Sequence, residues 1–297
     1  MSVDFVIPYY GDPEYLFATI DSIRAQHQQD WRLTVVDDQY PGNRALEYIE
    51  GLNDERIRYV RNEERLGPNG NTYKASTLAE REFVSMMGAD DLLEPNYLDV
   101  VLERMKADPN AIAVQPGVKV MDSDGVLVPS LGIGDKVKRR IAAPARKAGL
   151  ISGEDAVKSL LSGNWLYTPS LLYRQSALSK IPYRPDIDAV HDLAFMVDML
   201  MEGGNLLVDE REVFRYRRHQ ASDSSTRVKD GKRFDEELRY YGLIAKELRA
   251  KGWNAAARSA DLHLSSRLHA LMVAAGRLGA GDFAHAGAMV GRAVRSS

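Results

Sequence analysis

The stretch "FVSMMGADDLLEPNYL", residues 83–98, decides the fold prediction. An apolar run typical of a buried strand ends in two adjacent carboxylates, Asp90 and Asp91, and a helical pattern follows from Pro95. Two like charges side by side repel each other unless water, a cation or hydrogen-bond donors lie in front of them. The stretch therefore predicts a strand, a loop and a helix, with a polar site where the strand ends.

The first 121 residues alternate between short apolar runs and amphipathic segments. Strands are predicted at residues 4–10, 31–38, 56–62, 83–91 and 110–122, and helices at residues 13–26, 43–52, 71–83 and 95–108. Such alternation predicts an α/β fold with a mostly parallel central sheet flanked by helices. Ligands bind such sheets beyond the carboxyl ends of the strands, so the polar strand ends should meet at one cleft.

The second half of the chain is less regular. Residues 122–150 contain glycines, prolines and basic side chains, and they predict a mobile basic loop over the cleft or a solvated surface loop. Further helices are predicted at residues 151–163 and 190–204, a strand at 168–174, and a C-terminal helical region at 227–297. The C-terminal helices would pack on the core, form a homo-oligomer or rest on a membrane, and we favour the first two alternatives.

Composition sets limits on the class of protein. The 297 residues are 44% hydrophobic and 27% charged, with a net charge of −3, which is ordinary for a globular protein and gives no basic field for nucleic acid. No cysteine is present, so disulfides and thiolate metal sites are excluded. The amino-terminal residues do not resemble a signal peptide, and no apolar run is long enough to form a transmembrane segment. We therefore predict a cytoplasmic protein, with peripheral contact at the inner face of a membrane left open.

Several motifs in order resemble the family 2 glycosyltransferases, which are inverting enzymes with the GT-A fold. The first four are "FVIPYYGDPEYLFATIDSIRAQ", "WRLTVVDD", "RLGPNGNTYKA" and "FVSMMGADDLLEPNYL"; "NWLYTPSLLYRQSAL", "AVHDLAFMVDMLMEGG" and "FRYRRHQASDSS" resemble the second half of the same domain. The resemblance implies a GT-A domain at 1–226, with a nucleotide-binding half at 1–121, the basic loop at 122–150 and an acceptor and catalytic half at 151–226.

That resemblance implies an enzyme that moves a sugar from a nucleotide-diphosphate donor, most often a UDP-sugar, to the hydroxyl of a carbohydrate, a glycolipid or another acceptor. The family keeps an Asp-x-Asp motif at the end of this strand. Here Gly88 stands at its first Asp, Asp90 at the metal-binding Asp, and Asp91 follows. We expect Asp90 and Asp91 to bind Mn²⁺ or Mg²⁺, with His219 as a further ligand. The alternative is that the carboxylates cap the next helix, and that His219 is an ordinary polar residue.

The donor site is expected at the other strand ends. Asp37 and Asp38 match the pair that holds the nucleobase and ribose in this family, with the wall against the base formed by Pro8, Tyr9 and Tyr10. The alternative for the two carboxylates is a turn held by their own hydrogen bonds. Phosphate contacts are expected from Asn71 and Lys74, which are otherwise the first turn of an exposed helix.

The catalytic base of the family is an Asp at the start of a helix in the second half, commonly preceded by Glu. Asp192 has that position here, and His191 replaces the Glu as an acceptor contact or a second proton-handling group. Asp188 is a rival base, and a merely structural helix-start Asp is a further alternative. Weaker candidates for acceptor or phosphate contacts are Trp165, Arg217 and Arg218, and Trp165 is otherwise a core aromatic.

Two other functions compete with this prediction. A sugar nucleotidyltransferase would carry a glycine-rich basic loop after the first strand, but "PYYGDPEY" has one glycine and neither Lys nor Arg. A non-catalytic nucleotide-sugar-binding module of the same fold is favoured somewhat by Gly88, which removes a carboxylate from the motif.

Overall fold

The computed structural model describes residues 1–128, 133–182, 184–218, 232–279 and 281–294. Its strands are β1 Val3–Tyr9, β2 Trp31–Asp37, β3 Ile57–Arg61, β4 Phe83–Met86, β5 Leu92–Leu93, β6 Ala111–Met121, β7 Leu150–Ser152, β8 Leu172–Arg174 and β9 Asn205–Arg217. Its helices are α1 Pro13–Arg24, α2 Arg44–Gly51, α3 Gly67–Thr77, α4 Tyr97–Ala107, α5 Ile133–Ala148, α6 Gly153–Ser162, α7 Gln175–Leu178, α8 His191–Glu202, α10 Lys232–Ala250, α11 Asn254–Leu262, α12 Leu264–Gly279 and α13 Phe283–Val294. A short 3-10 helix, Thr168–Ser170, precedes β8.

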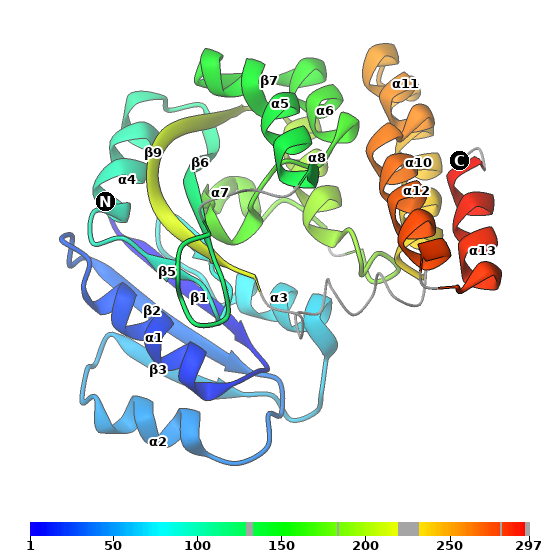
Figure 1. Cartoon of the computed structure of the whole chain (residues 1–297). Helices are drawn as coiled ribbons and strands as arrows, with labels where there is room; N and C mark the ends of the chain where they lie inside the picture. Colours follow the sequence, from blue (N-terminus) through cyan, green and yellow to red (C-terminus); the bar gives the residue numbers. More distant parts are fainter. Residues whose placement is uncertain (129–132, 183, 219–231, 280, 295–297) are drawn as a thin grey trace.

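One sheet organises the domain, in the strand order β3-β2-β1-β4-β8-β6-β9-β5, with β7 paired to β9 (Figure 1). The pairs β1–β2, β1–β4 and β2–β3 are parallel, which confirms the predicted parallel arrangement of the amino-terminal half. β8 is antiparallel to both β4 and β6. The carboxyl ends of β1, β2 and β4 therefore lie at the same edge of the sheet, as the sequence predicts.

Successive residues of the central strands face opposite sides of the sheet, and both sides are covered. Phe5 and Phe83 belong to a core cluster shared with α1, α2 and α4. Val6 and Val84 belong to a second cluster shared with α3, α6 and α8. Because both faces are buried, these strands carry continuous apolar runs instead of alternating apolar and polar residues.

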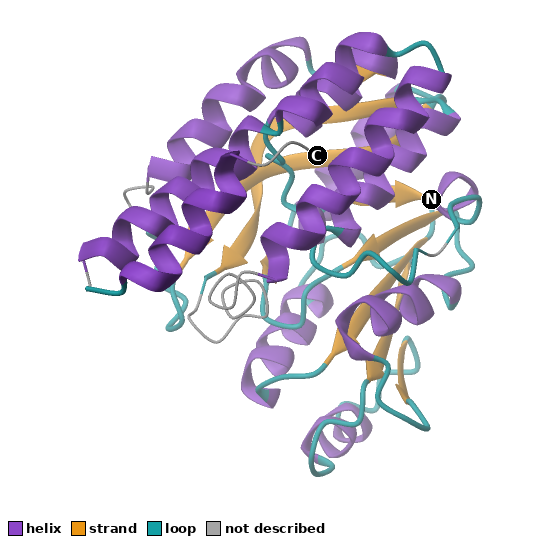
Figure 2. Cartoon of the chain, turned by 90° about the vertical axis from the view of Figure 1, so that its right-hand side faces the viewer, coloured by secondary structure: helices purple, strands orange, loops and turns teal. Residues whose placement is uncertain are grey.

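Part of the C-terminal helical region belongs to the second of these cores. Tyr240 and Ile244 of α10 and Ala257 of α11 are almost completely buried in the cluster that also holds residues of α6 and α8. In Figure 1 the C-terminal helices form a layer on one side of the sheet, and α6 and α8 lie between this layer and the sheet. Figure 2 shows the helical layer from its own side. The packing predicted for this region is thus confirmed for α10 and α11.

The expected loop at residues 122–150 is wrong for most of that segment, because residues 133–148 form the helix α5. Alanine, lysine and arginine are good helix formers, and they outweigh Pro144 inside the helix. Ala142 and Ala145 are buried in the second core cluster, which also holds residues of α6 and α8, and Ile141 packs against it. The packing of these three side chains thus stabilises a helix in a segment whose glycines and prolines predict an irregular loop.

Strand β9 is the main element that the sequence prediction lacks. It runs parallel to β6 over most of its length, with shifts of register around Gly117. A Cβ atom at Gly117 would lie 2.6 Å from the backbone oxygen of Glu210, so only glycine lets the two strands approach so closely. The last residue of β9, Arg217, is thereby brought to the loop that follows β4. Within the described ranges no helix is both long and apolar enough to cross a membrane.

Candidate functional site

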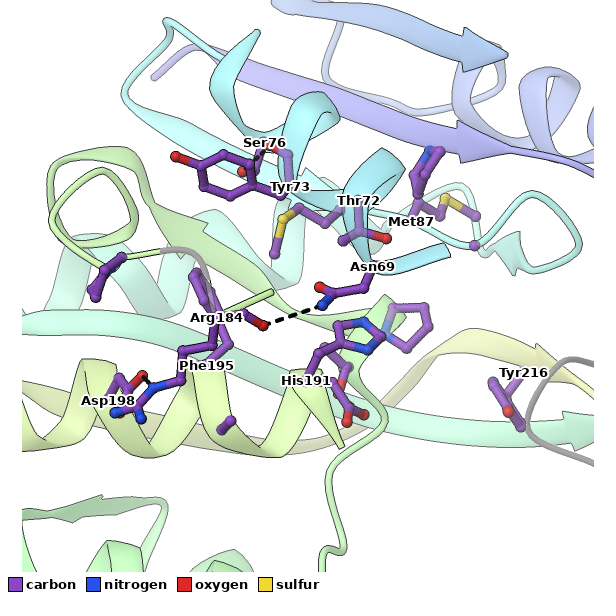
Figure 3. Close-up of a pocket in the computed structure, with 18 residues that line it drawn as sticks. Asn69, Thr72, Tyr73, Ser76, Met87, Arg184, His191, Phe195, Asp198 and Tyr216 are labelled. Carbon is purple, nitrogen blue, oxygen red and sulfur yellow. Dashed lines mark hydrogen bonds and ion pairs between the residues drawn. The ribbon is translucent and has the colours of Figure 1, made fainter. Parts of the chain in front are cut away.

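A cavity of about 310 Å³ lies between α3 and α8, beside the ends of β1 and β4 (Figure 3). Its lining residues come from several separate places in the chain. They are Pro8 of β1; Asn69, Thr72, Tyr73 and Ser76 of α3; Met86, Met87 and Gly88 at the end of β4; and His191, Asp192, Ala194, Phe195 and Asp198 of α8, together with Thr168, Pro169, Pro182, Arg184 and Tyr216. The cavity therefore lies at the sheet edge where a ligand was predicted.

Asp192, the predicted base, lies in the first turn of α8 and lines this cavity. One carboxylate oxygen, Oδ1, accepts from the backbone N–H of Leu193 at 2.8 Å, and the other, Oδ2, accepts from the hydroxyl of Thr168 at 3.0 Å. These donors fix the orientation of the carboxylate and still leave lone pairs for an incoming hydroxyl group. A negative charge is also favourable at a helix amino terminus. The carboxylate therefore lines the cavity in a fixed orientation, and its role as the base stays a prediction.

His191 and Asp188 differ in their access to the cavity. His191 lines it, and its Nδ1 lies 2.8 Å from the carbonyl oxygen of Asp188. A carbonyl oxygen only accepts, so Nδ1 carries a proton, and in the neutral ring Nε2 is the remaining acceptor. Asp188 itself is not among the residues that line the cavity. The geometry thus favours Asp192 over Asp188 as the base.

The loop after β4 places the two carboxylates of the opening sequence beside Gly88. A Cβ atom at Gly88 would lie 2.7 Å from Oδ2 of Asp91 and 3.0 Å from Oδ1 of Asp90. The two oxygens therefore occupy the space that a side chain at position 88 would need. The predicted alternative of a helix cap is wrong, because α4 begins only at Tyr97 and Asn96 occupies its N-cap position.

Asp91 is fully buried and only half satisfied. Its Oδ1 accepts from the backbone N–H of Arg217 at 2.8 Å, but its Oδ2 is buried without a hydrogen-bond partner. Burial, and then the charge of Asp90, raise the pKa of Asp91 well above its ordinary value. An unpartnered buried carboxylate oxygen next to a second carboxylate is what a hard divalent cation would satisfy. The residues present therefore fit a Mg²⁺ or Mn²⁺ ion, although no third His, Asp or Glu joins them among the residues that the structure describes.

Arg217 holds this loop instead of facing the cavity. Its side chain is 6% exposed, and its guanidinium donates to the carbonyl oxygens of Asp90 at 2.7 Å and Ser123 at 2.8 Å. The expectation that Arg217 binds phosphate is therefore wrong, because its donors are used inside the protein. Arg218 is exposed, and its role stays a prediction. His219 lies outside the described residues.

Asp37 and Asp38 are buried and make internal hydrogen bonds. Asp37 accepts from the backbone N–H of Tyr40 at 2.7 Å and from the hydroxyl of Tyr59. Asp38 accepts from the amide of Asn62 at 2.8 Å and from two backbone N–H groups at the start of α3. The alternative of a carboxylate that holds a local turn thus describes Asp37, whereas Asp38 joins segments that are far apart in the chain. Contact of either residue with a nucleotide stays a prediction.

Two further donor-site expectations are wrong. Asn71 is 2% exposed, and its amide bridges the side chain of Asn62 and the backbone of Val36, so it does not reach phosphate groups. The side chain of Tyr9 is 1% exposed in the core, so it cannot form a wall against a base. The two residues that flank Tyr9 in the chain can still form this wall.

Those neighbours are Pro8, which lines the cavity, and Tyr10, whose ring is 46% exposed. The guanidinium of Arg65 lies 3.9 Å from the centre of the Tyr10 ring, which extends the planar surface. Lys74 is half-buried, and it projects from a different face of α3 than the four residues that line the cavity. Its contact with phosphate stays a prediction.

Trp165 belongs to the core, as the alternative prediction for this residue states. It is 2% exposed, and its indole N–H donates to the hydroxyl of Ser159 at 3.1 Å. The expectation that it stacks on an acceptor sugar is therefore wrong. Thr168, Asn69 and Phe195 also line the cavity, but no sequence motif marks them, because segments that are far apart in the chain bring them together.

Comparisons with known proteins identify relatives of this chain. The family model described as Glycosyl transferase family 2 matches residues 4–173. An uncharacterized glycosyltransferase of Methanocaldococcus jannaschii, MJ1057, is 22% identical over 244 residues, which cover 81% of this chain and 78% of that protein. The putative teichuronic acid biosynthesis glycosyltransferase TuaG of Bacillus subtilis is 26% identical over 233 residues, which cover 78% of this chain and 84% of TuaG.

The fold is shared with solved structures. TarS 1-349 from S. aureus, in complex with UDP-GlcNAc, matches with a TM-score of 0.60 at 13% identity, over 98% of this chain and 91% of that fragment. The match to the longer TarS chain covers 40% of its length. At such identity the match establishes the fold alone, which is the GT-A fold. With the family model matching more than half of the sequence, the chain belongs to glycosyltransferase family 2 and is a glycosyltransferase.

Proposed function

We propose that this enzyme is an inverting glycosyltransferase that moves a sugar from a nucleotide-diphosphate donor to an acceptor hydroxyl, with Asp192 as the general base. One observation carries the proposal: Asp192 and Gly88 line the same cavity, and the carboxylates of Asp90 and Asp91 converge beside Gly88. In our proposal, Asp192 and a cation held by Asp90 and Asp91 act together at this cavity, because transfer from a diphosphate donor needs both a base and charge neutralisation.

The chemical step is a single displacement. The acceptor oxygen forms a bond to the anomeric carbon while the bond from that carbon to the diphosphate oxygen breaks. The proton of the acceptor hydroxyl goes to Asp192, whose carboxylate Thr168 and the N–H of Leu193 hold in place. Asp90 and Asp91 would hold Mg²⁺ or Mn²⁺, which neutralises charge on the leaving diphosphate. Met87 and Phe195 add apolar surface to the lining of the cavity.

A UDP-sugar is the donor that we propose. Support comes from the TarS fragment, whose structure is a complex with UDP-GlcNAc, and from the relative WfgD of Escherichia coli, which is named as a UDP-Glc-dependent glucosyltransferase. WfgD is 28% identical over 103 residues, which cover 35% of this chain and 40% of WfgD. For the acceptor we propose the hydroxyl of a carbohydrate or glycolipid.

A donor screen tests the proposal. Isothermal titration with UDP-, dTDP- and GDP-sugars in the presence of Mn²⁺ should give a Kd between about 1 μM and 1 mM for a UDP-sugar. Release of UDP should then follow when an acceptor is added. Binding without release of UDP under any acceptor would favour a non-catalytic module, and release of pyrophosphate from a nucleoside triphosphate would favour a nucleotidyltransferase.

We also propose a second copy of the chain as a partner, bound through α12 and α13. The inner face of α12 carries small residues, whereas its outer face carries exposed aliphatic side chains at alternating spacings of four and three residues. The exposed large hydrophobic residues on these two helices are Leu264, Leu268, Leu271, Met272, Leu278, Phe283, Val290 and Val294. Spacing of this kind suits helix-to-helix packing of the coiled-coil type.

The charges beside this face favour a second copy over a membrane. Arg277 pairs with Asp282 at 3.1 Å, and Arg292 pairs with Asp235 at 2.8 Å, so these cations are already neutralised. An anionic membrane surface would select basic side chains on the borders of the face. An uncharged apolar face matches an uncharged copy of itself across a two-fold axis.

Light scattering after size exclusion should therefore give twice the monomer mass. The double variant Leu268→Glu with Leu271→Glu should elute as a monomer, because each copy would bury charges against the other. Val126→Glu is the matched control, since Val126 is 62% exposed on a distant loop, and it should leave the dimer intact. A monomeric parent protein, or one that co-floats with anionic vesicles, would contradict this partner.

A further inference from the structure

The segment before α8 has little secondary structure of its own. Its described residues 184–190 form turns only, yet they lead directly into the helix that carries Asp192. No side chain caps this helix at Val190, so the preceding turns determine where its first residue lies. The carbonyl of Asp188 also accepts from His191 at 2.8 Å. The position of the base therefore depends on what holds residues 184–190.

Side chains from α10 hold the backbone of this segment. Oε1 of Glu236 accepts from the backbone N–H of Asp188 at 2.6 Å and also from the N–H of Ala189. The guanidinium of Arg239 donates to the carbonyl oxygen of Asp186. On the opposite side, the amide of Asn69 in α3 donates to the carbonyl oxygen of Ile187 at 2.7 Å. It also donates to the carbonyl oxygen of Arg184 at 3.4 Å, which is the dashed line from Asn69 in Figure 3.

A second connection runs from the same segment through Arg184. Its Nε and Nη2 donate to the two carboxylate oxygens of Asp198 in α8 at 2.7 and 2.8 Å, and Nη2 also donates to Glu247 of α10 at 3.1 Å. Arg184 and Asp198 both line the cavity. One guanidinium group thus joins the segment, the helix of the base and the C-terminal region, and its fixed planar fork orients all three.

We propose that Glu236 is a positioning residue for the transfer reaction, which it serves by fixing the turns that lead into Asp192. The proposal rests on the proposed function, in which Asp192 is the base. Helix α10 thereby becomes part of the catalytic unit, although it lies in the C-terminal region and does not line the cavity. Removing the acceptor for two N–H groups frees the segment to shift. A displacement of about 1 Å at a reacting group can cost roughly a hundredfold in rate.

Kinetics of matched variants test the proposal. Glu236→Ala should lower kcat about tenfold and leave the KM for the donor unchanged, because the donor contacts lie elsewhere in the cavity. Glu236→Gln keeps an acceptor oxygen and should restore most of the rate. Asp235→Ala is the control, since Asp235 is the neighbour of Glu236 on the same helix, carries the same charge and pairs with Arg292 instead of the segment. It should keep the parental kcat.

The outcomes separate this proposal from the proposed function. An unchanged kcat in Glu236→Ala, or equal losses in Glu236→Ala and Asp235→Ala, would overturn the positioning role. A rise in donor KM with kcat constant would do the same. Arg239→Ala, which removes the contact to Asp186, should show a smaller loss of kcat and covers the case in which Glu236→Ala fails to fold. Asp192→Asn is run in parallel: if it keeps the parental rate, the base assignment fails, whatever Glu236 does.

Discussion

Asp192→Asn is expected to slow sugar transfer by roughly 10²–10⁴-fold while the Kd for the donor stays nearly constant. The asparagine oxygen can still accept from the N–H of Leu193, so the side chain keeps its place in the first turn of α8. It cannot take a proton, however, and the acceptor hydroxyl is then a poor nucleophile. Initial rates of nucleoside diphosphate release measure the loss, and calorimetry measures donor binding.

The rival base supplies the comparison for this experiment. Asp188 does not line the cavity, so Asp188→Asn should retain most of the transfer rate. The opposite pattern, in which Asp188→Asn is inactive and Asp192→Asn is active, would show that the base is Asp188. Equal and complete loss in both variants, together with lost donor binding, would instead indicate that the region has unfolded.

Removal of divalent cations by a chelator is expected to reduce transfer by at least about a hundredfold, and Mn²⁺ or Mg²⁺ should restore it. The physical reason is the pair of carboxylates beside Gly88, one of which leaves a buried oxygen without a partner. Asp90→Asn removes one of the charges and should raise the Mn²⁺ concentration needed for half-maximal activity. A readout independent of activity is the thermal stabilisation that Mn²⁺ and UDP together give the parent protein and fail to give Asp90→Asn.

Glu94→Gln is the matched control for the metal experiment. Glu94 lies just after the same loop, but Arg215 at 2.9 Å and Lys119 at 3.1 Å already pair with its carboxylate. Its removal should leave the Mn²⁺ dependence unchanged. Full activity of the parent protein in excess chelator would show that the transfer needs no cation and that Asp90 and Asp91 have another role.

The sequence predicted those parts of the fold that depend on local patterns. The parallel strands β1, β2 and β4 appear as apolar runs because both faces of each strand are buried, and the polar residues after them mark the edge where the cavity lies. β9 escaped prediction because three consecutive exposed residues, 210–212, interrupt its apolar pattern where its register with β6 shifts. The polar residues 210–212 make the segment look like two short pieces, and only the pairing with β6 shows that they belong to one strand.

The donor site shows a second limit of sequence patterns. Residue type and position suggested that Asp38 and Asn71 face a ligand, but both satisfy their hydrogen bonds through Asn62, a residue from a different strand end. A polar side chain of a given type can bind a ligand or form internal hydrogen bonds. Which of the two it does depends on partners that only the fold brings near. Thr168 is the converse case, since only the fold places its hydroxyl beside Asp192. The cytoplasmic location stays a prediction from the sequence.

The glycine at position 88 has a consequence for the redesign of this site. A carboxylate there is blocked by Asp91, whose other oxygen the backbone of Arg217 holds and whose side chain therefore cannot swing away freely. A side chain at position 88 therefore requires the carboxylate of Asp91 to move, so the size of residue 88 and the rotamer of Asp91 are coupled. Any redesign of one of these two positions has to allow for the other.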